Sequence, residues 1–192
     1  MSVIHNWHNV RHSAVVIDTE TTGFADDDEI IEISIIDAKG AILLDTLVKP
    51  IVKDIPAEAT AIHGITNDDV ENAPHWDEIY TQVRTLLHQR KAIFYSKSFD
   101  VRLINQTCRR YGLRGTSYWP TQFMCALESY ADYRKIRDTK RGGYKWHKLS
   151  DAARHEGIEL PSDLHRSLAD AQLTLALIQH THATLQSQGA TA

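Results

Sequence analysis

The chain has 192 residues, of which 42% are hydrophobic and 24% charged, and its formal net charge is −4. These values fit one folded domain with one core and argue against a disordered chain and against binding duplex DNA by bulk electrostatics alone. The longest apolar runs are too short to cross a bilayer, and residues 1–11 lack an apolar signal core. We therefore expect a single cytoplasmic domain over residues 1–192, with its core from about residue 12 to 186 and no membrane partner.

Hydrophobic periodicity predicts an α/β protein. Short apolar or β-branched runs predict strands at 14–18, 30–37, 41–48 and 92–95. Proline positions predict two short helices, one that begins at Pro56 and another that ends at Ala73–Pro74. Helical spacing and glycine positions predict longer helices at 75–89, about 99–111, 124–136, 149–155 and 167–186. The order of these elements predicts a mixed sheet flanked by helices but leaves its topology open.

Two carboxylates, Asp18 and Glu20, stand at the end of the first predicted strand. Residues i and i+2 of a strand face the same side, so the two side chains should lie next to each other. Adjacent carboxylates repel each other and cost desolvation energy, whereas a hard divalent cation would bind both. Alone, such a pair is more often a solvated turn, but its position between an apolar strand and Thr21-Thr22-Gly23 favours a metal site.

Three further candidates stand near predicted helix starts. Asp100 follows the fourth strand, where helix capping or a first-turn charge is the alternative role. His165 and Asp170 would be rotated by about 140° on one continuous helix, so we expect His165 in a loop and Asp170 in the first turns of the last helix. The alternatives are a capping box between Ser167 and Asp170, and a surface role for His165.

Four carboxylates and one histidine suit metal-dependent hydrolysis of a phosphodiester. Two divalent ions about 3.5–4 Å apart can activate a water and stabilise charge on the leaving oxygen. A histidine, whose pKa is ordinarily near neutrality, can accept the proton of that water.

In their order along the chain these motifs resemble the DEDDh family of 3′→5′ exonucleases in the ribonuclease H-like superfamily. The resemblance covers residues 14 to about 180 and rests on Asp18-x-Glu20-Thr21-Thr22-Gly23, Ile31-Glu32-Ile33, Ile62-His63-Gly64-Ile65-Thr66, Phe99-Asp100 and His165-x-x-x-x-Asp170. It implies a ribonuclease H-like fold, with a mixed five-stranded sheet flanked by helices.

The resemblance also implies residue roles. His165 should be the general base of a catalytic set whose metal ligands, for two Mg²⁺ ions or substituting Mn²⁺, are Asp18, Glu20, Asp100 and Asp170. The residues expected to bind the terminal nucleotides are Thr21, Phe24, Ile62, His63, Ser96 and Phe99, with core packing as the alternative for Ile62 and Phe99. The family often has His-Asn where this chain has Tyr95-Ser96, which puts the usual asparagine contact with the substrate end in doubt.

A basic segment between Tyr133 and Lys148 interleaves aromatic residues with the cations Arg134, Lys135, Arg137, Lys140, Arg141, Lys145 and Lys148. Cations contact phosphates, and aromatic faces stack on single-stranded bases. We expect a flexible basic loop at about 137–146 that follows the strand upstream of the cleaved end. The alternative is a solvated, mobile loop without a ligand.

Together the residues predict a metal-dependent exonuclease that releases nucleoside 5′-monophosphates from a free 3′ end of single-stranded or frayed nucleic acid. Single-stranded DNA is favoured and RNA is open, as are a homodimer and a polymerase complex. Two other functions remain. The complete acid set disfavours a non-catalytic nucleic-acid-binding or polymerase-associated module, and the basic segment disfavours a phosphohydrolase of small substrates.

Overall fold

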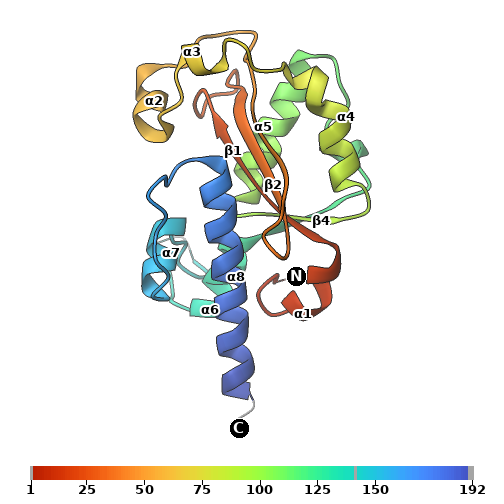
Figure 1. Ribbon diagram of the computed structural model, residues 1–192. Helices are drawn as coiled ribbons and strands as arrows, with labels where there is room; N and C mark the ends of the chain where they lie inside the picture. Colours follow the sequence, from red (N-terminus) through yellow and green to blue (C-terminus); the bar gives the residue numbers. More distant parts are fainter. Residues whose placement is uncertain (1, 141, 190–192) are drawn as a thin grey trace.

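The computed structural model describes residues 2–140 and 142–189, and in these ranges five strands form one mixed sheet with helices on both faces (Figure 1). The strands are β1 (Ala14–Thr21), β2 (Ile30–Asp37), β3 (Ile42–Leu47), β4 (Lys91–Phe94) and β5 (Gln122–Cys125). Their order across the sheet is β3-β2-β1-β4-β5. β2 pairs antiparallel with β1 and β3, whereas β4 pairs parallel with β1 and β5. The predicted α/β class and mixed sheet are confirmed.

Helices from different parts of the chain cover the two faces of the sheet, and in Figure 1 they stand on either side of the strands. One face carries α4 (Trp76–Leu87) and α5 (Lys97–Arg110), and the other carries α1 (Trp7–Val10), α6 (Ala126–Arg134), α7 (Leu149–His155) and α8 (Ser167–Gly189). The shorter elements are η1 (Arg11–Ser13), α2 (Ala57–His63), α3 (Asn67–Val70) and η2 (Thr116–Tyr118). Within the described ranges, no helix has the length and apolar character needed to cross a membrane.

Strand β1 contributes to a separate core on each face. Val15 and Ile17 pack in the cluster that contains α4 and α5, whereas Val16 packs in the cluster that contains α8. Because side chains alternate along a strand, Asp18 and Glu20 continue the face of Val16. Both carboxylates are therefore directed to the side of the sheet that α8 covers.

The residues before β1 belong to the core on the α8 face. Val3 and Ile4 are fully buried, and Trp7 and Val10 are nearly so. The backbone N–H of Val3 donates to the hydroxyl of Ser129 at 2.9 Å. The expected start of the core at about residue 12 is thus too late, because polar residues between these apolar ones hid their spacing.

Several predicted boundaries are wrong in ways that affect the site. β1 runs to Thr21 instead of ending at Asp18, because its pairing with β2 continues through an irregularity after Glu20. Residues 122–125 form β5, so the helix expected from residue 124 begins at Ala126. This strand is only four residues long and depends on parallel pairing with β4, which local periodicity does not reveal.

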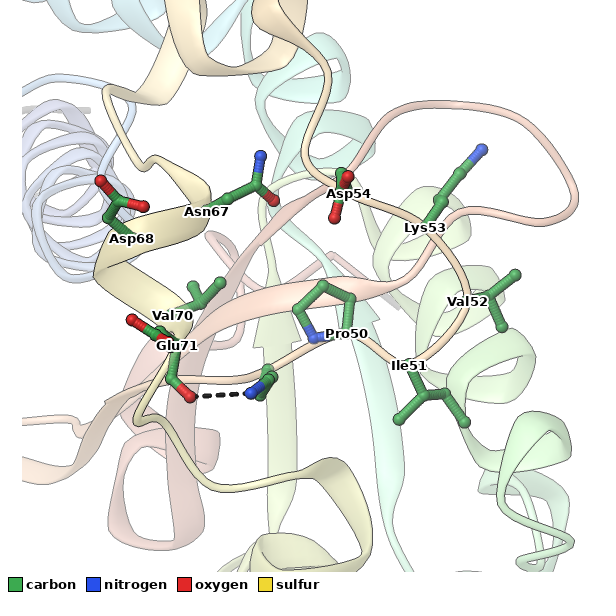
Figure 2. Close-up of a pocket in the computed structure, with 10 residues that line it drawn as sticks. Pro50, Ile51, Val52, Lys53, Asp54, Asn67, Asp68, Val70 and Glu71 are labelled. Carbon is green, nitrogen blue, oxygen red and sulfur yellow. Dashed lines mark hydrogen bonds between the residues drawn. The ribbon is translucent and has the colours of Figure 1, made fainter.

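The loop after β3 borders a hollow of about 550 Å³ beside α3 (Figure 2). Lys49 Nζ donates to the carbonyl of Glu71 at 2.9 Å, which ties the two sides of this hollow together. The Asn67 side chain, at the start of α3, accepts from the backbone N–H of Ile55 at 2.8 Å. None of the residues lining the hollow is a predicted site residue.

Candidate active site

Strand β1 and helices α5 and α8 bring the four predicted carboxylates to one cleft. Asp18, Glu20 and Asp170 each offer an oxygen, and these three oxygens lie within 4.8 Å of one another. Asp100 lines the same cleft, whose volume is about 640 Å³. The carboxylates that the sequence predicts to act together are thus neighbours in space.

Asp100 reaches the cleft because β4 is shorter than β1. β4 ends at Phe94, and the chain turns directly into α5, which places Asp100 in the first turn of that helix. Asp100 is buried, and its Oδ1 accepts a hydrogen bond from the Thr19 hydroxyl at 2.9 Å. The N-cap position belongs to Ser96, so the capping alternative for Asp100 is wrong.

Burial and mutual repulsion raise the pKa values of these carboxyl groups. Burial is the largest cause for Glu20, followed by repulsion from Asp170 and Glu32, and together they raise its pKa to about 9. Burial also raises the pKa of Asp100 to about 7, and the pKa values of Asp18 and Asp170 lie above their ordinary range mainly for the same reason. An oxygen-only cluster whose anionic form is disfavoured in this way fits a hard divalent cation.

His165 lies in the loop directly before α8, as predicted. Its Nδ1 is 4.0 Å from Asp170 Oδ2, and its backbone N–H donates to Asp170 Oδ1 at 3.4 Å. The side chain is 52% exposed and lines the cleft. Its φ of +69° is uncommon for a residue other than glycine. The backbone N–H of Ser167 donates to Glu32 and that of Asp170 donates to the Arg166 carbonyl, instead of to each other's side chains, so the capping-box alternative for Asp170 is wrong.

An ion pair between the buried Glu32 and the partly exposed Arg166 holds the loop that carries His165. Glu32 lies opposite Glu20 in the β1–β2 pairing and is 3% exposed. Its carboxylate accepts from Nε and Nη2 of Arg166 and, at 2.8 Å, from the backbone N–H of Ser167. Sequence reasoning gave Arg166 no role. The available signal was an acid inside the apolar run of β2.

Phe24 and Ile62 form an exposed ridge between two adjoining clefts. They are 73% and 49% exposed, and both line the acidic cleft and a second cleft of about 490 Å³. Phe99 lines both clefts too, with its ring centroid 5.5 Å from that of Phe24, and packs against the core on its other side. The core-packing alternative is therefore wrong for Ile62 and correct only in part for Phe99.

The remaining predicted substrate residues are divided between the two clefts. Ser96 lines the acidic cleft, whereas Thr21 and His63 line the second cleft. Thr21 donates its hydroxyl proton to the Gly23 carbonyl at 2.9 Å. His63 is buried and accepts from the backbone N–H of Ile65 at 3.0 Å, and burial lowers its pKa.

The loop between β1 and β2 is braced so that Phe24 stands at its surface. The Asp28 carboxylate accepts from the Thr22 hydroxyl and pairs with Lys53 Nζ, both at 2.7 Å. A Cβ atom at Gly23 would approach Asp28 Oδ2 to 2.6 Å, so this position requires glycine. The loop that carries Phe24 is thereby held beside the acids.

The basic segment is partly folded against the domain and partly exposed. Arg134 pairs with Glu156 at 3.2 Å. The backbone of Arg137 pairs with that of Tyr144 as an isolated antiparallel β-bridge, and the Arg137 guanidinium lies 5.3 Å from the centre of the tyrosine ring. Trp146 and Lys148 line the acidic cleft. Arg141, which the sequence analysis includes in this segment, lies outside the described residues.

Known proteins resemble this chain over most of its length. The family model RNase_T, described as an exonuclease, matches residues 15–178. The uncharacterized exonuclease CP81 of Escherichia phage 186 is 49% identical over 167 residues, which cover 85% of each chain. Two solved structures share the fold. They are the nuclease domain of 3′hExo, a DEDDh family member bound to rAMP (TM-score 0.70, 16% identity, 91% of this chain and 92% of that one), and E. coli ExoI with ssDNA in a zinc-bound form (TM-score 0.74, 17% identity, 89% and 40%).

Proposed function

Because residues 15–178 match its model, the chain belongs to the RNase_T family of exonucleases, and we propose that it is a metal-dependent 3′→5′ exonuclease that releases nucleoside 5′-monophosphates. The observation that carries this proposal is the convergence of oxygens from Asp18, Glu20 and Asp170 within 4.8 Å, next to His165 and Asp100. A protein that only binds nucleic acid has no need of a buried carboxylate cluster, which is costly to keep ionised.

The donor set specifies what the site would hold. Bound divalent ions would supply an activated water and stabilise charge on the leaving oxygen. Asp18, Glu20 and Asp170 would hold one ion, and Asp100 with Asp18 would hold a second, with Mg²⁺ as the expected metal and Mn²⁺ as a substitute. A fifth carboxylate, Glu32, stands next to these ligands, and the guanidinium of Arg166 balances its charge. Glu32 is therefore bound to the His165 loop and is not counted among the metal ligands.

The chain's own proton acceptor would be His165. Its ring is exposed at the edge of the cleft, where an attacking water has access, and its Nδ1 lies 4.0 Å from Asp170 Oδ2. The Glu32–Arg166 pair and the Asp170 carboxylate hold the loop from two sides. A general base fixed in this way needs little rearrangement when substrate binds.

The ridge suggests how the strand end is bound. Phe24 and Ile62 would contact the terminal bases together with Phe99, and Thr21 and His63 would meet the terminal nucleotide from the second cleft. Ser96, with its shorter hydroxyl, would replace the usual asparagine contact. A terminal base must leave its helix to reach such a ridge, which favours single-stranded or frayed ends. The relatives were solved with ssDNA and with rAMP, so both DNA and RNA are candidate substrates.

The test uses matched 5′-labelled single-stranded DNA and RNA, the same strands in blunt duplexes, and a 3′-blocked strand, each with Mg²⁺. A ladder that shortens from the 3′ end and a resistant blocked strand are expected. Asp18→Ala and Asp170→Ala should reduce cleavage to background, whereas Asp77→Asn, at an exposed position of α4, should retain it. Wild-type rates in both site variants would refute the assignment. Cleavage only of small phosphoesters would favour the phosphohydrolase, and binding without cleavage the non-catalytic module.

A further inference from the structure

Trp146 stands out among the residues that line the acidic cleft. We propose that its indole stacks on the base that precedes the terminal nucleotide, and that this contact makes the enzyme prefer single-stranded 3′ ends. The inference rests on the proposed exonuclease function and adds a specificity-determining residue to it. It also gives the basic segment a defined point of contact with the strand.

Trp146 is the one exposed tryptophan in the described part of the chain. Trp7, Trp76 and Trp119 are at most 6% exposed and belong to the cores, whereas Trp146 is 54% exposed. Aromatic side chains each bury about 150–250 Å² when they pack fully. A large apolar ring left in water at the wall of a cleft is therefore available for a ligand to cover.

The position of Trp146 identifies that ligand as a nucleobase. The indole lines the same cleft as the four carboxylates and as Phe24. With its volume of about 640 Å³, this cleft lies in the range of roughly 300–1,000 Å³ that is typical of small-molecule sites. When Phe24 and Ile62 contact the terminal base, the base that precedes it is the next flat surface along the strand. Trp146 is an aromatic side chain of the same cleft that has no other assigned ligand, so its indole can stack on this preceding base.

The backbone holds Trp146 in place from both sides. On one side, the N–H of Lys145 donates to the Ile136 carbonyl at 2.8 Å. On the other, the buried hydroxyl of Tyr95 donates to the His147 carbonyl at 2.6 Å. A platform that is already ordered loses little entropy when a base stacks on it.

The charges next to Trp146 also suit a nucleic-acid strand. Lys145 and Lys148 are exposed on either side of it in the sequence, and Lys148 lines the cleft. Aromatic stacking combined with neighbouring cations is the usual means of binding single strands without sequence preference. A base inside a duplex is already stacked and paired, so it has no free face for the indole.

Acrylamide quenching of tryptophan emission singles out Trp146, because the three other tryptophans are buried and shielded from the quencher. Tryptophan emission of the full chain, carrying Asp170→Asn to prevent turnover, would be recorded with Mg²⁺ and a ten-nucleotide thymidine strand. We expect the strand to change the emission and to protect it from acrylamide, and the same change to be lost in a Trp146→Phe background. A strand that binds by anisotropy without changing the emission would overturn the proposal.

Kinetics provide a second, independent measurement. Stacking contributes about 1–3 kcal/mol per base, so Trp146→Ala should raise KM for single-stranded oligonucleotides by about 5- to 150-fold with kcat kept. Trp146→Phe, which retains a ring, should restore most of the loss. Hydrolysis of the p-nitrophenyl ester of thymidine 5′-monophosphate, which has no neighbouring base, should be unchanged.

The outcomes separate this inference from the function on which it rests. An unchanged KM in Trp146→Ala, or an equal loss on the nitrophenyl ester, would show that Trp146 is not the stacking platform. An inactive wild-type protein would refute the exonuclease assignment instead, and the fluorescence measurement would still decide whether Trp146 meets a base.

Discussion

Replacing Glu32 by glutamine tests whether the Glu32–Arg166 ion pair positions His165, the proposed general base. The Glu32 carboxylate binds both the Arg166 guanidinium and the N–H of Ser167, at the point where the His165 loop enters α8. Glutamine keeps the volume and one acceptor oxygen but removes the charge. The substitution therefore separates electrostatic positioning from packing.

We expect Glu32→Gln to lower the free energy of unfolding by about 2 kcal/mol. Breaking a fully buried ion pair costs about 3–5 kcal/mol, but the Arg166 side chain is 44% exposed and can turn towards water. Loss of repulsion between Glu32 and Glu20, which face each other across β1 and β2, offsets a further part. In a chain of this length 1 kcal/mol shifts Tm by about 2–4 °C, so Tm should fall by about 4–8 °C.

Thermal unfolding followed by circular dichroism, with and without Mg²⁺, measures this change. Asp151→Asn is the matched control, because it breaks an exposed pair with Arg154 and should cost less than about 1 kcal/mol. Kinetic assays should show a lower kcat for Glu32→Gln at saturating Mg²⁺ with unchanged metal affinity. Equal losses of stability in the two variants, or a wild-type kcat in Glu32→Gln, would refute the positioning role.

Three other outcomes follow from the site. Without divalent ions the folded chain keeps a proton on Glu20 up to a pH of about 9, whereas the unfolded chain releases it near 4.5, so the free energy of unfolding should fall as pH rises between these values. Urea titrations in EDTA check this, and the slope should flatten in Glu20→Gln; a stability that rises with pH would contradict the sign. His165→Ala should reduce kcat by about 10²- to 10⁴-fold with Mg²⁺ affinity kept, and loss of metal binding, measured by calorimetry, would reassign the residue. Tyr95→Phe leaves the buried His147 carbonyl unpaired, so it should cost about 1–3 kcal/mol in urea and raise KM for single strands; a variant with unchanged KM would mean that the hydroxyl does not position Trp146.

Three of the four carboxylates in the candidate site were predictable because each has a local signal. Asp18 and Glu20 follow an apolar run at the two-residue spacing of a strand face, and Asp170 lies near the start of the last helix. Periodicity also identified β1 to β4 and most helices. It missed β5, because a four-residue strand takes its conformation from pairing with β4 rather than from its own sequence.

Contacts between segments that are distant along the chain could not be predicted from the sequence. The Glu32–Arg166 pair joins residues 134 positions apart, and the Tyr95–His147 hydrogen bond joins residues 52 positions apart. Each contact depends on where the elements that carry its two residues pack, and no local pattern encodes that. The ridge at Phe24 and Ile62 is a similar case, since exposed apolar residues look like core residues until the fold places them.

The Glu32–Arg166 ion pair and the Tyr95–His147 hydrogen bond fix two different walls of the acidic cleft, and their effects should be separable by mutation. Glu32 and Arg166 fix the side that carries His165, whereas Tyr95 fixes the side that carries Trp146, and the two contacts share no hydrogen-bond partner. Glu32→Gln should therefore act on kcat and Tyr95→Phe on KM. In the double variant the two effects should combine within about 0.5 kcal/mol of additivity, measured as kcat/KM on one single-stranded substrate. A larger coupling would mean that strand binding and proton transfer depend on a shared movement of the cleft, and the account of two independently fixed walls would be wrong.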